Sequence, residues 1–88
     1  MLYRILTENK NREAVEDIVS AEFPWFTIIE ATGYWNGVRE ESLIIEIDAG
    51  NEIKGLTVMR IAELVRRHNK QSSVMVQAIT AQTKFLGR

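Results

Sequence analysis

The Asn36-Gly37 dipeptide constrains the fold more than any other feature of this chain, because it lies between two runs of aromatic, β-branched and other apolar residues. Both residues tolerate the positive φ angles of a type I′ turn, whose twist matches that of two antiparallel strands. We therefore predict a tight β-hairpin made of the segments Phe26–Trp35 and Val38–Ile47. In this register Trp35 faces Val38 directly across the turn.

Both faces of the predicted hairpin are apolar. Side chains alternate across a strand, so one face carries Phe26, Ile28, Leu43, Ile45 and Ile47, and the other carries Ile29, Ala31, Trp35, Val38 and Ile44. An antiparallel sheet with helices on one side normally has a polar second face. Either a bulge or register shift gathers these residues into one core, or the second face packs on another subunit. We favour a dimer or trimer, because burying about 400 Å² per chain contributes on the order of 10 kcal/mol before association costs.

The segments around the hairpin complete a ferredoxin-like βαββαβ pattern. Leu2–Thr7 is typical of a strand, and Asn9 or Asn11 is a candidate cap for a helix that ends before Pro24. A second helix is expected from about Ile53 to His68, and a last strand from Ser72 to Ile79. With right-handed crossovers, this order gives one α+β domain, residues 1–88, with a four-stranded antiparallel sheet in the spatial order 4-1-3-2 and two helices on one face. The apolar face of the second helix is expected to carry Thr57, Ile61, Leu64, Val65 and His68, with Val58 and Ala62 beside it.

Composition excludes several classes of protein. The chain has 88 residues, no cysteine and a formal net charge of −1, so it has no disulfide and no general attraction for nucleic acid or anionic membranes. The run Met1–Leu6 is too short for a signal peptide, and no stretch is long and apolar enough for a membrane helix, so the cytoplasm is the expected location. The two strands expected at the centre of the sheet offer only Tyr3 for base stacking, so an RNA-binding role is not favoured.

No catalytic, metal-binding or cofactor signature is present. There is one histidine, His68, and it is expected to complement the dipole at a helix end. Gly33, Gly37, Gly50 and Gly55 do not form a phosphate-binding motif. We therefore predict no cofactor and no metal site.

Binding is expected to concentrate at the hairpin tip, at Tyr34, Trp35 and Arg39. Tyr34 and Arg39 are directly opposite each other, within reach of a cation–π contact of roughly 0.5–1 kcal/mol. Trp, Tyr and Arg are also the residues that most often dominate binding energy at interfaces. The alternative is that Trp35 packs on a neighbouring subunit or on the C-terminal tail near Phe85.

The stretch from Ala31 to Ile47, ATGYWNGVREESLIIEI, resembles the central hairpin of PII-like small proteins, which include the PII nitrogen regulators and the CutA divalent-cation-tolerance proteins. The second helix and the segment Ser73–Ile79 fit the same layout. The resemblance implies a ferredoxin-like subunit that assembles, often as a trimer, and meets ligands or partners at subunit clefts. The tight turn leaves no room for the long partner-binding loop of PII regulators, and no nucleotide-binding or copper-binding residue can be carried over.

Three functions remain open from the sequence. The favoured one is a non-enzymatic oligomeric module that binds a small ligand or a protein at the hairpin tip or at a subunit cleft. The second is a cofactor-independent enzyme of the dimeric α+β barrel type, with a site lined by Tyr34, Trp35, Arg39 and His68. The third is a phage or mobile-element inhibitor that docks on a host protein.

Overall fold

The computed structural model describes residues 1–50 and 54–87 and has the predicted element order. The elements are β1 (Leu2–Glu8), α1 (Arg12–Ser20), β2 (Thr27–Trp35), β3 (Val38–Asp48), α2 (Gly55–His68) and β4 (Met75–Ile79). The predicted helix start near Ile53 lies outside the described residues. The last strand begins at Met75 rather than Ser72, and residues 80–87 form no further strand.

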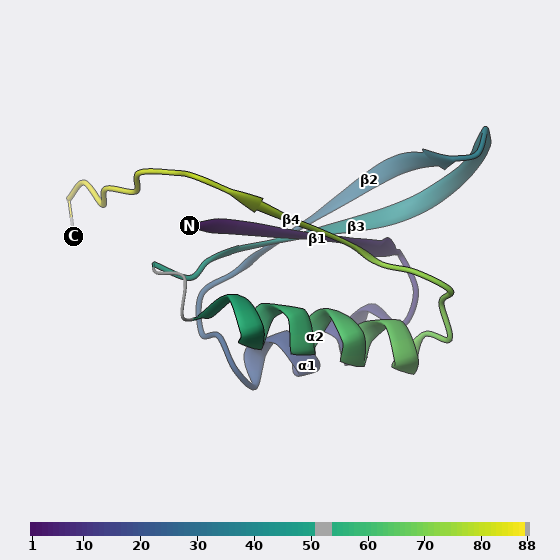
Figure 1. Ribbon diagram of the computed structural model, residues 1–88, viewed down its shortest axis with the longest axis horizontal. Helices are drawn as coiled ribbons and strands as arrows, with labels where there is room; N and C mark the ends of the chain where they lie inside the picture. Colours follow the sequence, from purple (N-terminus) through teal and green to yellow (C-terminus); the bar gives the residue numbers. More distant parts are fainter. Residues whose placement is uncertain (51–53, 88) are drawn as a thin grey trace.

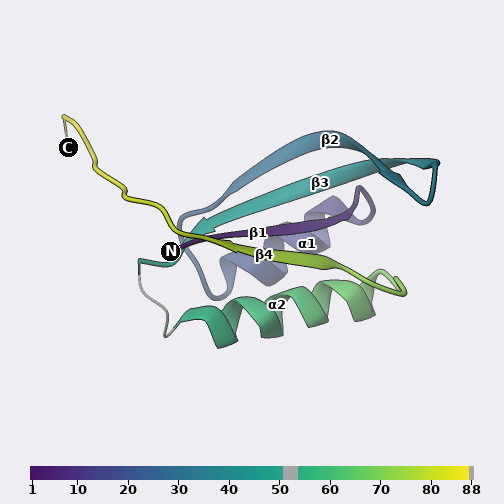
Figure 2. The same cartoon turned by 45° about the horizontal axis from the view of Figure 1, so that its top comes forward.

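The four strands form one antiparallel sheet in the order β2-β3-β1-β4, which confirms the ferredoxin-like topology. Figure 1 shows α1 and α2 together under one face of this sheet, while no helix or strand of the described residues covers the other face. Figure 2 shows the β2–β3 hairpin extending past the end of β1 on one side and the C-terminal tail running away on the other. The hairpin tip and the tail therefore lie at opposite ends of the sheet.

The hairpin has the predicted turn and register. Asn36 and Gly37 have φ angles of 50° and 78°, as a type I′ turn requires. Every residue of β2 pairs without interruption, from Trp35 opposite Val38 to Thr27 opposite Glu46. A bulge or register shift is therefore ruled out, and the hairpin has two apolar faces.

The hydrophobic core lies between the sheet and the two helices. It is made of Tyr3, Ile5, Val15, Val19, Phe23, Ile45, Ile47, Val58, Ile61, Ala62 and Val65. The predicted face of α2 is wrong in part, because Leu64 is 43% exposed and His68 is exposed as well. The buried positions follow the i, i+3, i+4, i+7 spacing from Val58. The helix is therefore rotated about its own axis by about one residue from the predicted orientation.

The predicted cap of α1 is also wrong in its mechanism. Asn11 does occupy the position before Arg12, but its backbone is left-handed (φ 53°) and its side chain makes no capping hydrogen bond. Its Nδ2 instead donates to Oδ1 of Asn69 at the end of α2, at 3.0 Å. The Asn11 side chain therefore links α1 to the end of α2 and does not cap α1.

Candidate functional site

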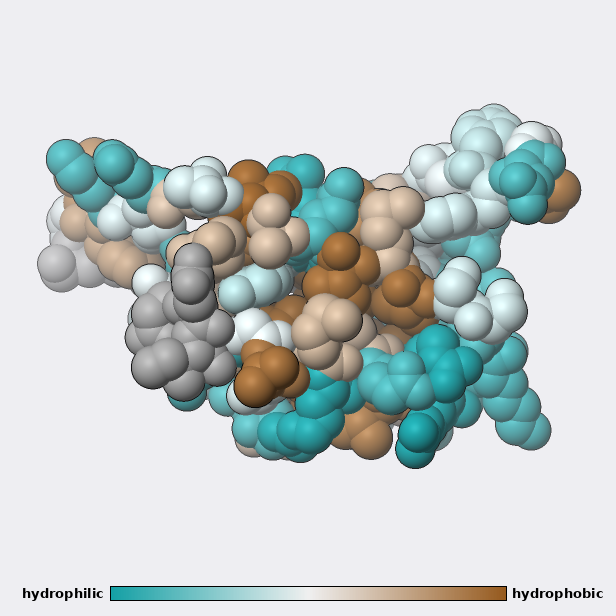
Figure 3. Space-filling view, in the orientation of Figure 1, coloured by the Kyte–Doolittle hydropathy of each residue, from teal (hydrophilic) through white to brown (hydrophobic). Residues whose placement is uncertain are grey.

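The open face of the sheet carries an apolar row that crosses all four strands. Ile29 pairs with Ile44, Ile44 pairs with Leu6, and Leu6 pairs with Met75. We call these four residues the open-face row. Figure 3 views the sheet from its edge, and apolar and hydrophilic side chains are mixed along the top between the hairpin tip and the tail. The sequence predicted the apolar character of this face in the hairpin, and the pairing extends it to β1 and β4.

A polar row runs beside the open-face row, two residues further along each strand. It contains Thr27, Glu46, Arg4 and Gln77. Arg4 Nε lies 2.7 Å from Glu46 Oε2, so the two opposite charges compensate each other within the face. The open face therefore presents apolar surface with no net charge at its centre.

The hairpin tip overhangs the rest of the sheet, because β1 pairs with β3 only between Ser42 and Asp48. Tyr34 and Arg39 face each other across the two hairpin strands on the helix side of the sheet, where no helix covers them, and Tyr34 is 68% exposed. The expected cation–π contact is absent among the described residues, since Arg39 Nη2 pairs with Glu41 Oε1 at 2.9 Å. Trp35 lies on the opposite side, so the three predicted residues do not form one cluster.

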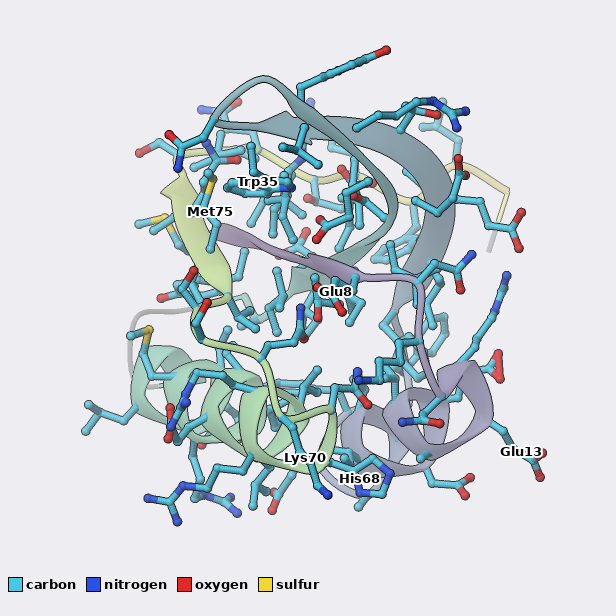
Figure 4. All side chains as sticks on the ribbon, turned by 90° about the vertical axis from the view of Figure 1, so that its right-hand side faces the viewer. Glu8, Glu13, Trp35, His68, Lys70 and Met75 are labelled. Atoms are coloured by element: carbon cyan, nitrogen blue, oxygen red, sulfur yellow. The ribbon has the colours of Figure 1, made fainter. Side chains whose placement is uncertain are left out.

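Trp35 folds back along its own strand onto the open face. A Cβ atom built on Gly33 would lie 3.2 Å from the indole Nε1 and 2.9 Å from Ser42 Oγ. Because Gly33 has no side chain, the indole can lie over it. Ser42 belongs to the open face, yet it is only 4% exposed. Figure 4 shows the Trp35 ring between the hairpin and the neighbouring strands, on the side of Met75. Trp35 itself remains 37% exposed.

A groove of about 250 Å³ opens beside this indole, and we call it the tip groove. The hairpin contributes one wall, the end of β1 contributes the floor, and the loop between α2 and β4 contributes the other wall. The lining residues are Trp35, Asn36 and Glu40 from the hairpin, Leu6, Thr7 and Glu8 from β1, and Gln71, Ser72 and Ser73 from the loop. Sequence reasoning found only Trp35 among these, because the loop and β1 meet the hairpin through tertiary structure alone.

The loop wall of the tip groove is held by a Schellman turn at the end of α2. Lys70 is left-handed (φ 56°), the Gln71 N–H donates to the Arg66 carbonyl at 3.0 Å, and the Lys70 N–H donates to the Arg67 carbonyl at 3.2 Å. The Thr7 hydroxyl in turn donates to the side-chain oxygen of Gln71. These bonds fix the position of the loop against β1.

Asn69 also holds the same loop in place. It is the most buried polar residue of the described chain, at 1% exposed. Its Nδ2 donates to the Lys10 carbonyl at 3.0 Å, and Lys10 Nζ donates back to the Asn69 carbonyl at 2.9 Å. Because a buried amide is costly unless it is hydrogen-bonded, these contacts hold β1, α1 and α2 in one arrangement. Asn69 directly follows His68, where the sequence predicts the end of the second helix.

The tip groove is acidic. Glu8 and Glu40 are both half-buried, and neither makes an ion pair with any residue that the structure describes. Glu40 Oε2 accepts one hydrogen bond, from Ser42 Oγ at 3.1 Å. No basic side chain lines the groove within the described ranges.

A second groove lies at the tail end of the molecule. Trp25 and Phe85 pack at a centroid distance of 6.1 Å, and with Phe23, Pro24 and Asp48 they line an apolar groove of about 520 Å³. The alternative that Trp35 packs on the tail near Phe85 is therefore wrong, because the tail leaves β4 toward the other end of the sheet. Hydrogen bonds from the Thr83 hydroxyl and the Gly50 N–H hold the pKa of Asp48 below its ordinary value.

The remaining charged residues are largely paired on the surface. Glu63 bonds Arg66 and Arg67, and the hydrogen bond from Arg66 is the main cause that lowers the pKa of Glu63 to about 2. His68 lines a shallow groove with Asn11 and Asp17 on the helix side, so it does not meet Trp35 in one site. In residues 1–50 and 54–87 no group of three acidic, His or Cys side chains could hold a metal ion. None of the described helices has the length and apolarity needed to cross a membrane.

Comparison with known proteins bears on the fold. A DUF3240 family protein from Shewanella baltica OS155 is similar, with a TM-score of 0.63 and 16% identity over 96% of this chain and 93% of that chain. The de novo designed protein Foldit4 is also similar, with a TM-score of 0.51 and 27% identity over 92% of this chain and 94% of that one. No protein-family model and no curated protein matches. These likenesses support the α+β fold, and a fold of this kind by itself specifies no activity.

Proposed function

We propose that this protein is a non-enzymatic module that assembles with copies of itself through the open face and binds a ligand or protein partner at the hairpin tip. The observation that carries the proposal is the open-face row, an apolar line across four strands that none of the described helices or strands covers. Trp35, with Tyr34 and Arg39 on the other side of the tip, would supply the binding residues.

A second copy is the occupant that best fits this face. Two copies present the same row to each other, as a two-fold interface requires. The charge of −1 per chain opposes association only weakly, and Arg4 and Glu46 compensate each other beside the row. A standard interface buries about 800 Å² per partner. The row would therefore have to be extended by neighbouring apolar residues of the open face, such as Ala31, away from the tip groove.

The test uses two lysine substitutions on the same strand and the same face. Ile29→Lys places a charge in the open-face row, whereas Thr27→Lys places it in the polar row two residues away. Both side chains are exposed in the single chain, so both variants should fold. Sedimentation equilibrium at micromolar concentration should give a dimer or trimer for the parent protein and Thr27→Lys, and a monomer for Ile29→Lys. A monomer mass for the parent protein across that range would refute the proposed assembly.

A further inference from the structure

We propose that the tip groove binds a compact organic cation, a primary ammonium or guanidinium group. This deepens the proposed function, since it rests on the hairpin tip being a binding site and names the chemistry of its ligand. The cationic group would lie between Glu8 and Glu40, beside the Trp35 indole.

The spacing of the two carboxylates fits one cation. Glu8 pairs directly with Ser42, and Glu40 lies two residues before Ser42 on the same face of β3. Diagonal neighbours of this kind in an antiparallel pair are about 7–8 Å apart at their backbones. Their side chains can therefore converge on one ammonium or guanidinium group, with a charge-assisted hydrogen bond from each side.

The electrostatic state of the groove also favours a cation. Two half-buried carboxylates without ion-pair partners repel each other across a site that contains no described basic side chain. Elsewhere on the described chain, Arg4, Arg12, Arg39, Arg60, Arg66 and Arg67 are paired with acidic residues. The groove is therefore a place where this chain leaves two negative charges together, and a bound cation would relieve their repulsion.

Trp35 supplies the second recognition element. An indole attracts organic cations more strongly than the other aromatic rings do, through the electron density of its face. Its position over Gly33 keeps it beside the groove. The hydroxyls of Ser72 and Ser73 and the Asn36 amide line the same space and can accept the remaining N–H groups. The volume of about 250 Å³ limits the ligand to a small amine or to the end of a Lys or Arg side chain.

A hydrated metal ion fits this groove less well than an organic cation. The groove offers two carboxylates and the neutral oxygens of Asn36, Ser72 and Ser73, but the indole and Leu6 take up part of its lining and supply no ligand, whereas calcium takes six to eight oxygen ligands. The apolar floor contributed by Leu6 and the indole suits the alkyl part of an amine. The test therefore separates the two kinds of cation.

Binding is measured by titrating propylammonium chloride and methylguanidinium chloride into protein that carries Trp25→Phe, so that Trp35 is the only tryptophan and its emission reports on the groove. Sodium chloride controls for ionic strength, 1-propanol for apolar contact, and magnesium chloride for a metal site. A saturable change with either organic cation, absent with the three controls, is the expected result. No saturable change up to about 50 mM, an equal response to 1-propanol, or saturation by magnesium alone would overturn the proposal.

Three charge-removing variants assign the site. Glu8→Gln and Glu40→Gln should each weaken binding about tenfold or more, as the loss of one charge-assisted hydrogen bond implies. Glu41→Gln, next to Glu40 but on the other face and paired with Arg39, should bind like the parent protein. Equal affinity in all three variants would refute the assignment to this groove. Sedimentation of the same samples separates the two proposals, because cation binding by a monomer refutes only the assembly, and assembly without cation binding refutes only the cation site.

Discussion

Both faces of the sheet carry apolar side chains, but the two faces meet different surroundings. Ile44 and Ile45 are neighbours on β3, yet Ile45 is 0% exposed in the core between sheet and helices, while Ile44 lies on the open face. Alternation along the strand separates them, and the helices cover only one side. A strand that is apolar on both sides therefore buries both of its faces only when another layer of protein covers each side of the sheet.

The covered face is completed within one chain. Ile5, Ile45 and Val76 pack against residues from both helices, and the polar bonds around Asn69 close one end of this layer. Among residues 1–50 and 54–87 no element covers the open face in this way, and its row is flanked by the compensated pair Arg4–Glu46. The stability of the first face is therefore a property of the fold, whereas that of the second depends on protein concentration if copies associate.

Alanine substitutions at Ile44 and Ile45 should give the largest difference in the free energy of unfolding between the two faces. Ile45→Ala leaves a cavity in a fully buried layer and should lower the free energy of unfolding by about 2–5 kcal/mol. Ile44→Ala should cost about 1 kcal/mol or less in dilute protein, with a larger cost as the concentration rises. Urea denaturation at two protein concentrations measures both effects. Equal costs at every concentration would mean that the open face is as well packed as the core.

The turn determines which residues lie on which face, so the second prediction targets Gly37. Its φ of 78° is in the left-handed region, and a Cβ there would meet no other atom within 4 Å, so any cost comes from the backbone. Gly37→Val should lower the free energy of unfolding by more than about 1 kcal/mol, because a β-branched residue resists positive φ. Thermal denaturation beside Val38→Ala, a change next to the turn with no φ constraint, tests it. An unchanged melting temperature would show that the turn tolerates another geometry.

Much of this fold could be predicted from local signals. The Asn-Gly pair determines the turn, and the turn determines the hairpin register residue by residue, so both faces were predictable. The start of β4 and the rotation of α2 were less predictable, because the weak alternation at Ser72–Val74 does not specify a boundary and apolar residues around most of α2 do not specify a buried face. Tertiary packing determines the buried face there: Val58, Ile61 and Val65 belong to the core between sheet and helices, whereas Leu64 is exposed.

The candidate site was predictable only in its hairpin part. Trp35 stood out as an aromatic residue beside a tight turn, away from the core. Glu8, Gln71 and Ser72 join it only because β1 and the α2–β4 loop are brought to the same end of the sheet, and no local pattern marks them. The loop itself depends on a left-handed Lys70 and on the bonds of Asn69, which connect residues nearly 60 positions apart in the sequence.

The smallest expected effect on stability concerns Gly33, which lies under the Trp35 indole. In Gly33→Ala the new methyl group would lie 2.9 Å from Ser42 Oγ and 3.2 Å from the indole Nε1, so these side chains must move. On the open face they can move toward solvent, and alanine recovers some of the entropy that glycine loses on folding. The free energy of unfolding should therefore change by about 0.5 kcal/mol or less, while the emission of Trp35, read in the Trp25→Phe background, shifts to longer wavelength. The matched control is Ala31→Gly, on the same strand and face but one step further from the indole, which should leave the emission unchanged. A Gly33→Ala protein with the parent spectrum would show that the indole does not lie over Gly33, and the wall that it gives to the tip groove would have to be placed elsewhere.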